Sequence, residues 1–242
     1  MERIDKLLVK LGFADSIKMA QALVIAGDVL VNEQKVANSS VKFKETDKIR
    51  VKSKSPYVSR AAYKLKTALD NFKLDVTNYN CVDIGSSTGG FTDLLLQNGA
   101  SFVYAIDVGT NQLAYKLRTN KKVKSLEKTN ARYFDFMKLE NIDLYTGDLS
   151  FISLKLILKQ FIPAMKPKSK ALMLIKPQFE VSKDIADKYN GIIKDKLIHN
   201  DVISDIKSFL NDYSIKIIDV IPSVLAGTHG NQEYIIYFIK NE

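Results

Sequence analysis

Hydrophobic positions in the first fifth of the chain repeat twice at helical spacing and then at strand spacing. A first helix is predicted over residues 3–11, with apolar positions at Ile4, Leu7, Leu8 and Leu11. A second helix is predicted between a cap at Asp15 or Ser16 and a stop at Gly27. Its apolar positions are Ile17, Ala20, Leu23 and Val24. Strands at 29–31 and 49–51 complete the pattern of a small α+β unit.

From residue 59 onward, short apolar runs alternate with amphipathic stretches. An amphipathic helix is predicted over 59–72, then a strand at Cys81–Ile84, a glycine turn, and a second strand at Phe102–Ile106. Further strands are predicted at Val123–Leu126, Leu144–Leu149, Ala171–Ile175, Ile215–Ile221 and Tyr234–Ile239. Helices are expected between most of them. This alternation predicts a parallel α/β sheet with helices on both faces.

The two patterns are separated by a polar stretch, Arg50–Tyr57, which contains serines and lysines and ends in a Pro-Tyr pair. That composition is typical of a linker. We therefore predict a first domain at 1–53, a linker at 54–58 and a second domain at 59–242. The charged segment 182–196 lacks an apolar period, and we expect it to be a mobile loop near the site that becomes ordered on RNA.

Composition narrows the class of protein. The 242 residues carry 36 Lys plus Arg against 27 Asp plus Glu, a formal charge of +9, and the first 60 hold 12 against 7, or +5. Such a balance favours polyanionic partners, nucleic acid first and an anionic membrane second. One cysteine and two histidines disfavour a disulfide framework and a metal site. No apolar run approaches the ~20 residues of a membrane span, and no signal peptide is evident, so a cytoplasmic location is expected.

The glycine turn after the first strand predicts a cofactor site. Open α/β sheets bind ligands at the carboxyl ends of their strands. The turn lacks the Gly-Lys-Ser/Thr of a triphosphate loop, and its glycines at 85, 89 and 90 depart from the dinucleotide spacing. Asp107, at the end of the second strand, can accept both hydroxyls of a ribose, and Asp83 suits a cation. These features favour S-adenosylmethionine, a sulfonium, over NAD, although a tight packing turn would also use glycines.

The first unit resembles the S4 RNA-binding domain. The resemblance rests on Arg3–Leu8, Gly12–Ser16 and Ala22–Asn32. It implies phosphate-type contacts with structured RNA, which position the protein without reading sequence. The residues expected to make them are Arg3, Lys18, Lys35, Lys42 and Arg60. Lysines scattered over a solvated face remain the alternative.

The whole chain resembles the TlyA family, in which an S4 domain precedes an FtsJ-like methyltransferase domain. The motifs are Asp83–Thr92, Asp107–Leu113, Glu127–Asn130, Asp148–Ser153, Lys176–Glu180 and Gly230–Tyr234. Ser86 and Gly147 stand where Ala is usual, and Lys194 where Arg is usual. The resemblance implies methyl transfer to the ribose 2′-hydroxyl of a cytidine in ribosomal RNA, 23S in the first place and 16S second. S-adenosylhomocysteine would be the product, and no metal is expected.

The same resemblance assigns site residues. Cofactor contacts are expected from Asp83, Gly85, Ser86, Ser87, Gly89, Gly90, Phe91, Asp107, Val108, Asn130 and Asp148. The catalytic tetrad of FtsJ-like enzymes matches Lys64, Asp148, Lys176 and Glu233. Lys176 is expected to act as the base or proton relay with its pKa lowered by Lys64, while Asp148 orients Lys176 and Glu233 positions the second lysine or the ribose. Surface ion pairs at strand ends are the alternative.

Other functions remain open at this stage. The chain could be an RNA-binding ribosome assembly factor with a vestigial cofactor site, or a membrane-active cytolysin. A pseudouridine synthase is disfavoured because the Gly-Arg-Leu-Asp motif is absent. The expected partner is ribosomal RNA or a ribosomal subunit, bound by a monomer without stable membrane association. Three aromatic residues are candidates for stacking on an extruded base, with a core role as the alternative: Tyr57, Phe151 and Phe179.

Overall fold

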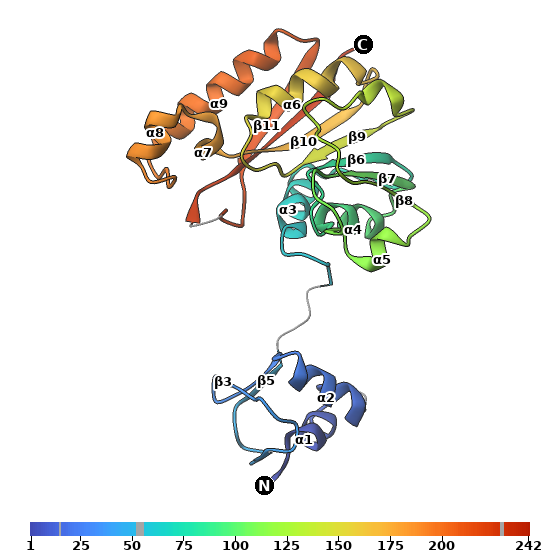
Figure 1. Cartoon of the computed structure of the whole chain (residues 1–242), viewed down its shortest axis with the longest axis vertical. Coiled ribbons are helices and arrows are strands. Elements are labelled where there is room, and N and C mark those ends of the chain that lie inside the picture. Colours follow the sequence, from blue (N-terminus) through green and yellow to red (C-terminus); the bar gives the residue numbers. More distant parts are fainter. Residues whose placement is uncertain (15, 52–55, 228–229) are drawn as a thin grey trace. The chain divides into compact units, whose positions relative to one another are not determined.

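The computed structural model describes residues 1–14, 16–51, 56–227 and 230–242. The chain divides into two compact units, Met1–Pro56 and Tyr57–Glu242 (Figure 1). Residues 54 and 55 of the predicted linker lie outside the described residues, as does Asp15, one of the two candidate helix caps. Each unit is described by itself below.

The first unit packs two helices against short strands. Its elements are β1 (Glu2–Arg3), α1 (Ile4–Lys10), α2 (Ile17–Ile25), β2 (Val29–Val31), β3 (Gln34–Lys35), β4 (Lys42–Phe43) and β5 (Ile49–Val51). The strands form a three-stranded sheet in the order β3-β2-β5 and a separate β1-β4 pair. Ser16 caps α2, because its hydroxyl accepts a hydrogen bond from the Met19 N–H at 3.2 Å. Six of the eight apolar residues that predicted the two helices lie in the core of this unit, whereas Leu11 and Ile17 are 38% and 41% exposed.

The second unit is a seven-stranded sheet between helices. Its strands are β6 (Asn80–Ile84), β7 (Phe102–Ile106), β8 (Val123–Leu126), β9 (Leu144–Gly147), β10 (Lys170–Ile175), β11 (Ile215–Pro222) and β12 (Tyr234–Lys240). Its helices are α3 (Ala62–Phe72), α4 (Gly90–Gln97), α5 (Tyr115–Arg118), α6 (Leu154–Phe161), α7 (Pro177–Glu180), α8 (Lys183–Lys188) and α9 (Lys196–Asn211), with short 3-10 turns at Phe136–Lys138 and Ile162–Ala164. The predicted α/β class, with a small α+β unit ahead of it, is confirmed.

The strand order is β11-β12-β10-β9-β6-β7-β8. The prediction of a parallel sheet is wrong for one strand, since β12 runs antiparallel to both of its neighbours, β10 and β11. Only 11 residues, 223–233, connect β11 to β12. A connection that short permits an antiparallel return, whereas a parallel strand needs a crossover of about a dozen residues or more.

Helices cover both faces of the sheet, α3 and α4 on one side and α6 and α9 on the other (Figure 1). Alternation along β6 shows how the sequence directs this packing. Cys81 packs in the cluster that holds α3 and α4, whereas Val82 and Ile84 pack in the cluster that holds α6 and α9. Buried in this way, the Cys81 thiol has a raised pKa, which agrees with the structural role of a small core residue.

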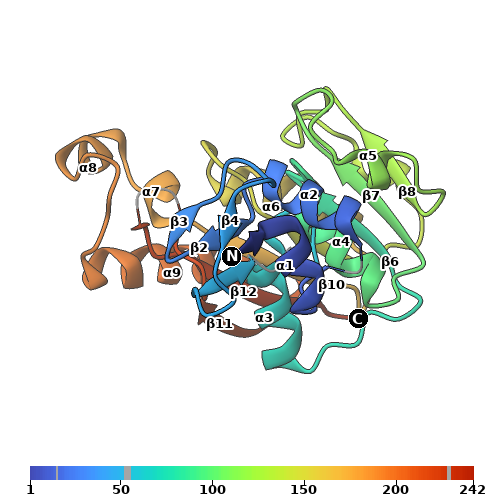
Figure 2. The same cartoon turned by 90° about the horizontal axis from the view of Figure 1, so that it is seen from below.

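Segment 182–196 differs from its prediction as a loop. It contains α8, whose N-terminus is capped by Ser182, and Ile193 is only 1% exposed. The Ile193 N–H donates to the Asn231 side chain at 2.9 Å. The helix is short and its surface is charged, so its apolar period was too weak to be recognised. Figure 2 shows α8 and β8 at opposite ends of the second unit.

Candidate active site

Polar residues gather where five strands of the second unit end or begin. The carboxyl ends of parallel strands meet at one edge of a sheet. Asp83 lies near the end of β6, while Asp107, Asp148 and Lys176 directly follow β7, β9 and β10. Because β12 is antiparallel, its first residue, Tyr234, pairs with Ile175 at the end of β10. Glu233 therefore reaches the same edge.

Four charged side chains meet at this edge, and we refer to Lys64, Asp148, Lys176 and Glu233 as the four-charge cluster. Lys64, from the first turn of α3, donates from Nζ to Asp148 Oδ2 at 3.1 Å and to Glu233 Oε2 at 2.7 Å. Lys176 Nζ lies 2.5 Å from Asp148 Oδ1 and 4.0 Å from Glu233 Oε1. The two lysine amines thus share the same two carboxylates.

Burial makes the cluster unlike a surface ion pair. Lys64, Lys176 and Glu233 are 9%, 7% and 2% exposed. Burial by itself lowers the pKa of Lys64, but Asp148 and Glu233 outweigh it and the pKa is raised. Burial likewise favours a protonated Asp148, but Lys176 and Lys64 outweigh it and lower the pKa of that carboxyl. Lys64 stays an ammonium and Asp148 a carboxylate, and their interaction is screened less than that of a pair on the surface.

The glycine turn between β6 and α4 depends on left-handed backbone. Gly89, at the N-cap of α4, has φ of +93°, and a Cβ there would collide with Leu117 and Leu113. Gly85 has φ of +78°, and a Cβ would approach the Asp148 carbonyl oxygen within 3.2 Å. Only glycine adopts both positions without strain. The turn therefore keeps its backbone close to Asp148 and to the cavities beside it.

Two carboxyl groups are fixed around this turn. Asp83 Oδ2 accepts hydrogen bonds from the Thr92 N–H at 3.0 Å and the Thr92 hydroxyl at 2.6 Å. Burial raises the pKa of Asp83 to about 7, while the two Thr92 hydrogen bonds act against that rise. Asp107 accepts the Ser87 N–H at 2.8 Å and the Gly109 N–H at 2.7 Å, one on each oxygen. Thr92 thus holds the Asp83 carboxyl in place, and two backbone N–H groups hold that of Asp107.

Two cavities adjoin the turn. The first, which we call the cluster cavity, has a volume of about 340 Å³ and contains the four-charge cluster together with predicted cofactor residues Asp83, Gly85, Ser86, Ser87, Gly90 and Phe91. The second, the Asp107 cavity, has a volume of about 480 Å³ and contains predicted residues Gly85, Ser87, Asp107, Val108, Asn130 and Asp148. Gly89 lies in the described lining of neither, and it acts by shaping the turn.

Comparisons with known protein families match both units of the chain. A model of FtsJ-like methyltransferases matches residues 57–240, and a model of the S4 domain matches residues 2–49. A relative from Mycobacterium tuberculosis, named 16S/23S rRNA (cytidine-2′-O)-methyltransferase TlyA, is 35% identical over 97% of this chain and 88% of its own. The chain belongs to the TlyA family of FtsJ-like methyltransferases.

Other relatives of this TlyA-family chain carry a different kind of name. Hemolysin A of Brachyspira hyodysenteriae is 39% identical over 98% of this chain and 99% of its own. A solved structure from Streptococcus thermophilus, named as a hemolysin, is 37% identical with a TM-score of 0.76, covering 100% of this chain and 89% of that one. No helix in the described part of the chain is long and apolar enough to cross a bilayer.

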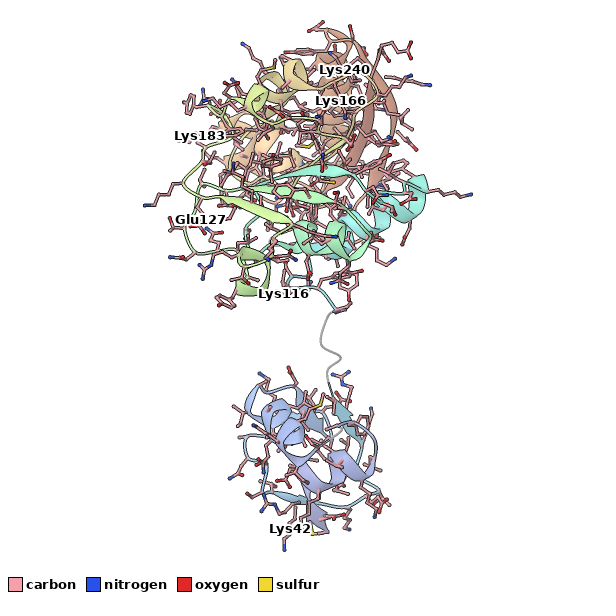
Figure 3. The ribbon with its side chains drawn as sticks, turned by 90° about the vertical axis from the view of Figure 1, so that its right-hand side faces the viewer. Lys42, Lys116, Glu127, Lys166, Lys183 and Lys240 are labelled. Carbon is pink, nitrogen blue, oxygen red and sulfur yellow. The ribbon has the colours of Figure 1, made fainter. Side chains whose placement is uncertain are left out.

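The predicted RNA-contact residues of the TlyA-family chain fall into two groups. Lys18, Lys35 and Lys42 are exposed on α2, β3 and β4, and none of them forms an ion pair with any described residue (Lys42 is labelled in Figure 3). Arg3 instead makes a two-pronged contact with Asp5, which is 1% exposed, at 3.1 and 2.7 Å. Arg60 is exposed and lines the cluster cavity.

Sequence reasoning overlooked a second basic stretch, residues 116–138, which we call the β8 basic segment because it surrounds that strand. Its eight basic side chains are all exposed, and the segment contains only two acidic residues. Its net charge of +6 exceeds the +5 of the first 60 residues. Lys116 and Glu127 are labelled in Figure 3. The eight are Lys116, Arg118, Lys121, Lys122, Lys124, Lys128, Arg132 and Lys138. A windowed count of charge would have revealed it.

Within the described residues, no group of three or more His, Cys, Asp or Glu side chains is arranged to hold a metal ion.

The predicted stacking residues Phe151 and Phe179 have ring centroids 5.0 Å apart, and Phe151 is 91% exposed. Tyr57 instead packs edge to face on Tyr63 at 5.4 Å. Two of the three aromatic candidates thus lie together next to Lys176, whose Nζ is 6.0 Å from the Phe179 ring.

Proposed function

We propose that this chain transfers a methyl group from S-adenosylmethionine to the ribose 2′-oxygen of a cytidine in ribosomal RNA. The observation that carries the proposal is the buried four-charge cluster, which lines the cluster cavity with the glycine turn. The name of the Mycobacterium tuberculosis relative supports the cytidine and the ribose oxygen as targets. The S4 unit supports RNA as the substrate.

The residues of the turn fit S-adenosylmethionine chemically. Asp83 offers a carboxyl to a cationic group, and each Asp107 oxygen keeps a lone pair for a ribose hydroxyl after accepting its backbone N–H. Ile106, Val108 and Ile157 give the Asp107 cavity apolar walls suited to a base. When bound, the cofactor supplies a methyl group attached to a positively charged sulfur.

A ribose 2′-hydroxyl is a weak nucleophile, so the protein has to remove its proton and align it with the methyl carbon. Lys176 is the proposed base or immediate proton relay. Asp148 Oδ1 and the Ser150 hydroxyl, which accepts from Lys176 Nζ at 2.9 Å, fix the direction of that amine. A fixed amine beside the cavity supplies the orientation that the reaction needs.

Lys64 and Glu233 support this chemistry. The raised pKa of Lys64 keeps its ammonium charged, so it can stabilise the alkoxide that develops on the ribose oxygen. Glu233, 2.7 Å from Lys64 and 2% exposed, fixes that ammonium. Asp148 bridges the two lysines and lies at the border of both cavities. We propose that this border is where methyl transfer takes place.

The basic surfaces of both units support RNA as the substrate. The S4 unit carries exposed lysines and the β8 basic segment carries eight exposed cations, both suited to phosphate interactions. We propose 23S ribosomal RNA as the first substrate, 16S ribosomal RNA as the second, and action as a monomer in the cytoplasm without stable membrane association.

The proposal is tested by incubating the purified chain with S-adenosylmethionine labelled in its methyl group and ribosomal subunits from cells that lack the gene. The expected product is 2′-O-methylcytidine in the digested RNA. Calorimetry tests the alternative of an assembly factor with a vestigial cofactor site. That alternative would be favoured if the chain did not bind S-adenosylmethionine at millimolar concentration. Dye release from anionic vesicles tests the cytolysin alternative. Transfer to no RNA, with cofactor binding intact, would overturn the proposal.

A further inference from the structure

A third cavity lies beside the four-charge cluster. It has a volume of about 360 Å³, and we call it the Gln178 cavity. It shares Lys176, Glu233 and Ser150 with the cluster cavity, and its remaining walls include Phe151, Phe179 and Gln178. A nucleotide whose ribose reached Lys176 would therefore have room for its base here. Phe151, Phe179 and Gln178 do not belong to the cluster and are among the side chains able to contact that base.

Gln178 has an unusual feature among these walls. Its Oε1 is buried and accepts no hydrogen bond within the described residues. A buried acceptor without a donor is unfavourable in a folded protein, and such groups are rare. Gln178 belongs to α7, immediately after Lys176 and Pro177, so the first helical turn after β10 fixes its backbone. The acceptor is therefore free to take a hydrogen bond from a ligand.

The two phenylalanines give the cavity a surface for a planar group. Phe151 is 91% exposed, and its backbone has φ of +62°, a conformation that is unfavourable for a large residue. Backbone strain of this kind persists where function maintains it. The Phe179 ring lies 5.0 Å from the Phe151 ring. Unstacked RNA bases bind to such aromatic faces.

We propose that Gln178 determines which base the site accepts: its Oε1 accepts a hydrogen bond from the exocyclic amino group at position 4 of cytosine. This inference rests on the proposed function and deepens it by naming the residue that selects the base. Uracil has a carbonyl oxygen at the same position. With the amide held so that Oε1 faces the base, two acceptors would meet in a buried setting, so uridine is rejected.

The experiment compares two RNA transcripts that contain the mapped target, one with cytidine and one with uridine at that position. Wild-type protein is expected to methylate the cytidine transcript faster on the order of 10- to 100-fold. Gln178→Met keeps the length of the side chain but removes its acceptor, and it should bring the ratio of the two rates close to one. Gln178→Ala should do the same, and Gln178→Glu, which retains an acceptor, should keep the preference for cytidine.

The controls separate base selection from other effects. Gln178 Oε1 has no partner within the described residues, so its removal breaks no hydrogen bond there, and thermal unfolding should be unchanged. Cofactor affinity should also stay at the wild-type value. Gln160→Ala, an exposed substitution on α6, serves as the matched control. A Gln178→Met protein that keeps the wild-type ratio, or a wild-type protein that methylates both transcripts equally, overturns the inference and leaves the proposed function standing. If the protein transfers a methyl group to neither transcript, both the inference about Gln178 and the proposed function are overturned.

Discussion

Two lysines and two carboxylates determine the chemistry at the scale of single residues. Asp148 bridges the two lysines, with one oxygen 3.1 Å from Lys64 and the other 2.5 Å from Lys176. The paired charges stabilise each other against the cost of burial, since an isolated buried charge would be expensive. Removing one member therefore changes both the chemistry and the charge of the site.

Lys176→Ala should lower the rate of methyl transfer by at least ~10²-fold, because the variant has no base at that position. Asp148 keeps Lys64 as its partner, so thermal unfolding should still show a folded protein. Asp148→Ala should also abolish transfer. Lys170→Ala, at the other end of the same strand, is the matched control and should remain active. Transfer by Lys176→Ala at a rate close to the wild type would remove Lys176 from its assigned role.

The pH dependence of cofactor binding should follow Asp83. Its pKa is raised to about 7, so the group is neutral at lower pH and becomes a carboxylate above that value. A cationic ligand favours the carboxylate, so binding releases a proton and affinity should rise from pH 5.5 to 7, by up to about tenfold per pH unit. Calorimetry should show a weaker, pH-independent affinity for Asp83→Asn. A wild-type affinity that does not change over this range would contradict the assignment.

The sequence predicted some of these residues and missed others for a physical reason. Lys64, Asp148, Lys176 and Glu233 were selected by the family motifs around them, whereas spacing by itself left surface ion pairs open. Gln178 was not selected, although it follows Lys176 by two positions. A residue type does not reveal whether a side-chain oxygen has a partner. Only the folded environment shows that the Gln178 acceptor is unpaired among the described residues.

At the scale of elements, the sequence pattern predicted all seven strands of the second unit, and the central strands β6 and β10 are buried and carry apolar residues on both faces. The direction of a strand could not be predicted in the same way, because the apolar run of β12 is compatible with a parallel and with an antiparallel strand. The short connection 223–233 was the available signal. It matters for the site, because the direction of β12 brings Glu233 to the edge where Lys176 lies.

The glycine turn gives a prediction at this scale. Gly89→Ala should weaken cofactor binding at least ~10-fold, because a Cβ at φ of +93° is strained and collides with the Leu117 side chain, so the turn or that side chain must shift. Gly99→Ala is the matched control: its φ is +88°, but it lies beyond α4, next to Thr77. It should lower the free energy of unfolding by ~1–2 kcal/mol and leave affinity unchanged. Equal affinity in both variants would show that the turn does not shape the site.

At the scale of the whole molecule, the net charge of +9 is unevenly distributed. The first 60 residues contribute +5 and the β8 basic segment +6, so the remaining residues sum to −2. Each domain of this TlyA-family chain therefore has its own basic stretch. Counting charge over the sequence predicted the first stretch, but dividing the chain only at residue 60 averaged the second with acidic neighbours.

Both basic stretches should contribute to RNA binding without reading sequence. Replacing Lys18 and Lys35 with Gln, or Lys121, Lys122 and Lys124 with Gln, should weaken binding to all RNAs. The slope of log affinity against log salt should fall by about 0.7–0.9 for each phosphate that is no longer neutralised. Filter binding at several salt concentrations measures this slope. Lys159→Gln, an exposed substitution on α6, should change neither quantity, and cofactor affinity should stay constant throughout. An unchanged slope in both multiple variants would exclude these lysines from phosphate binding.

The central claim is that the chain methylates a cytidine ribose in ribosomal RNA. The most direct test maps 2′-O-methyl groups in the ribosomal RNA of cells with the gene, without it, and complemented by wild type or by Lys176→Ala. We predict that a cytidine loses its 2′-O-methyl group when the gene is absent, regains it with wild type, and remains unmodified with Lys176→Ala. Identical 2′-O-methyl maps in all four strains would contradict the account.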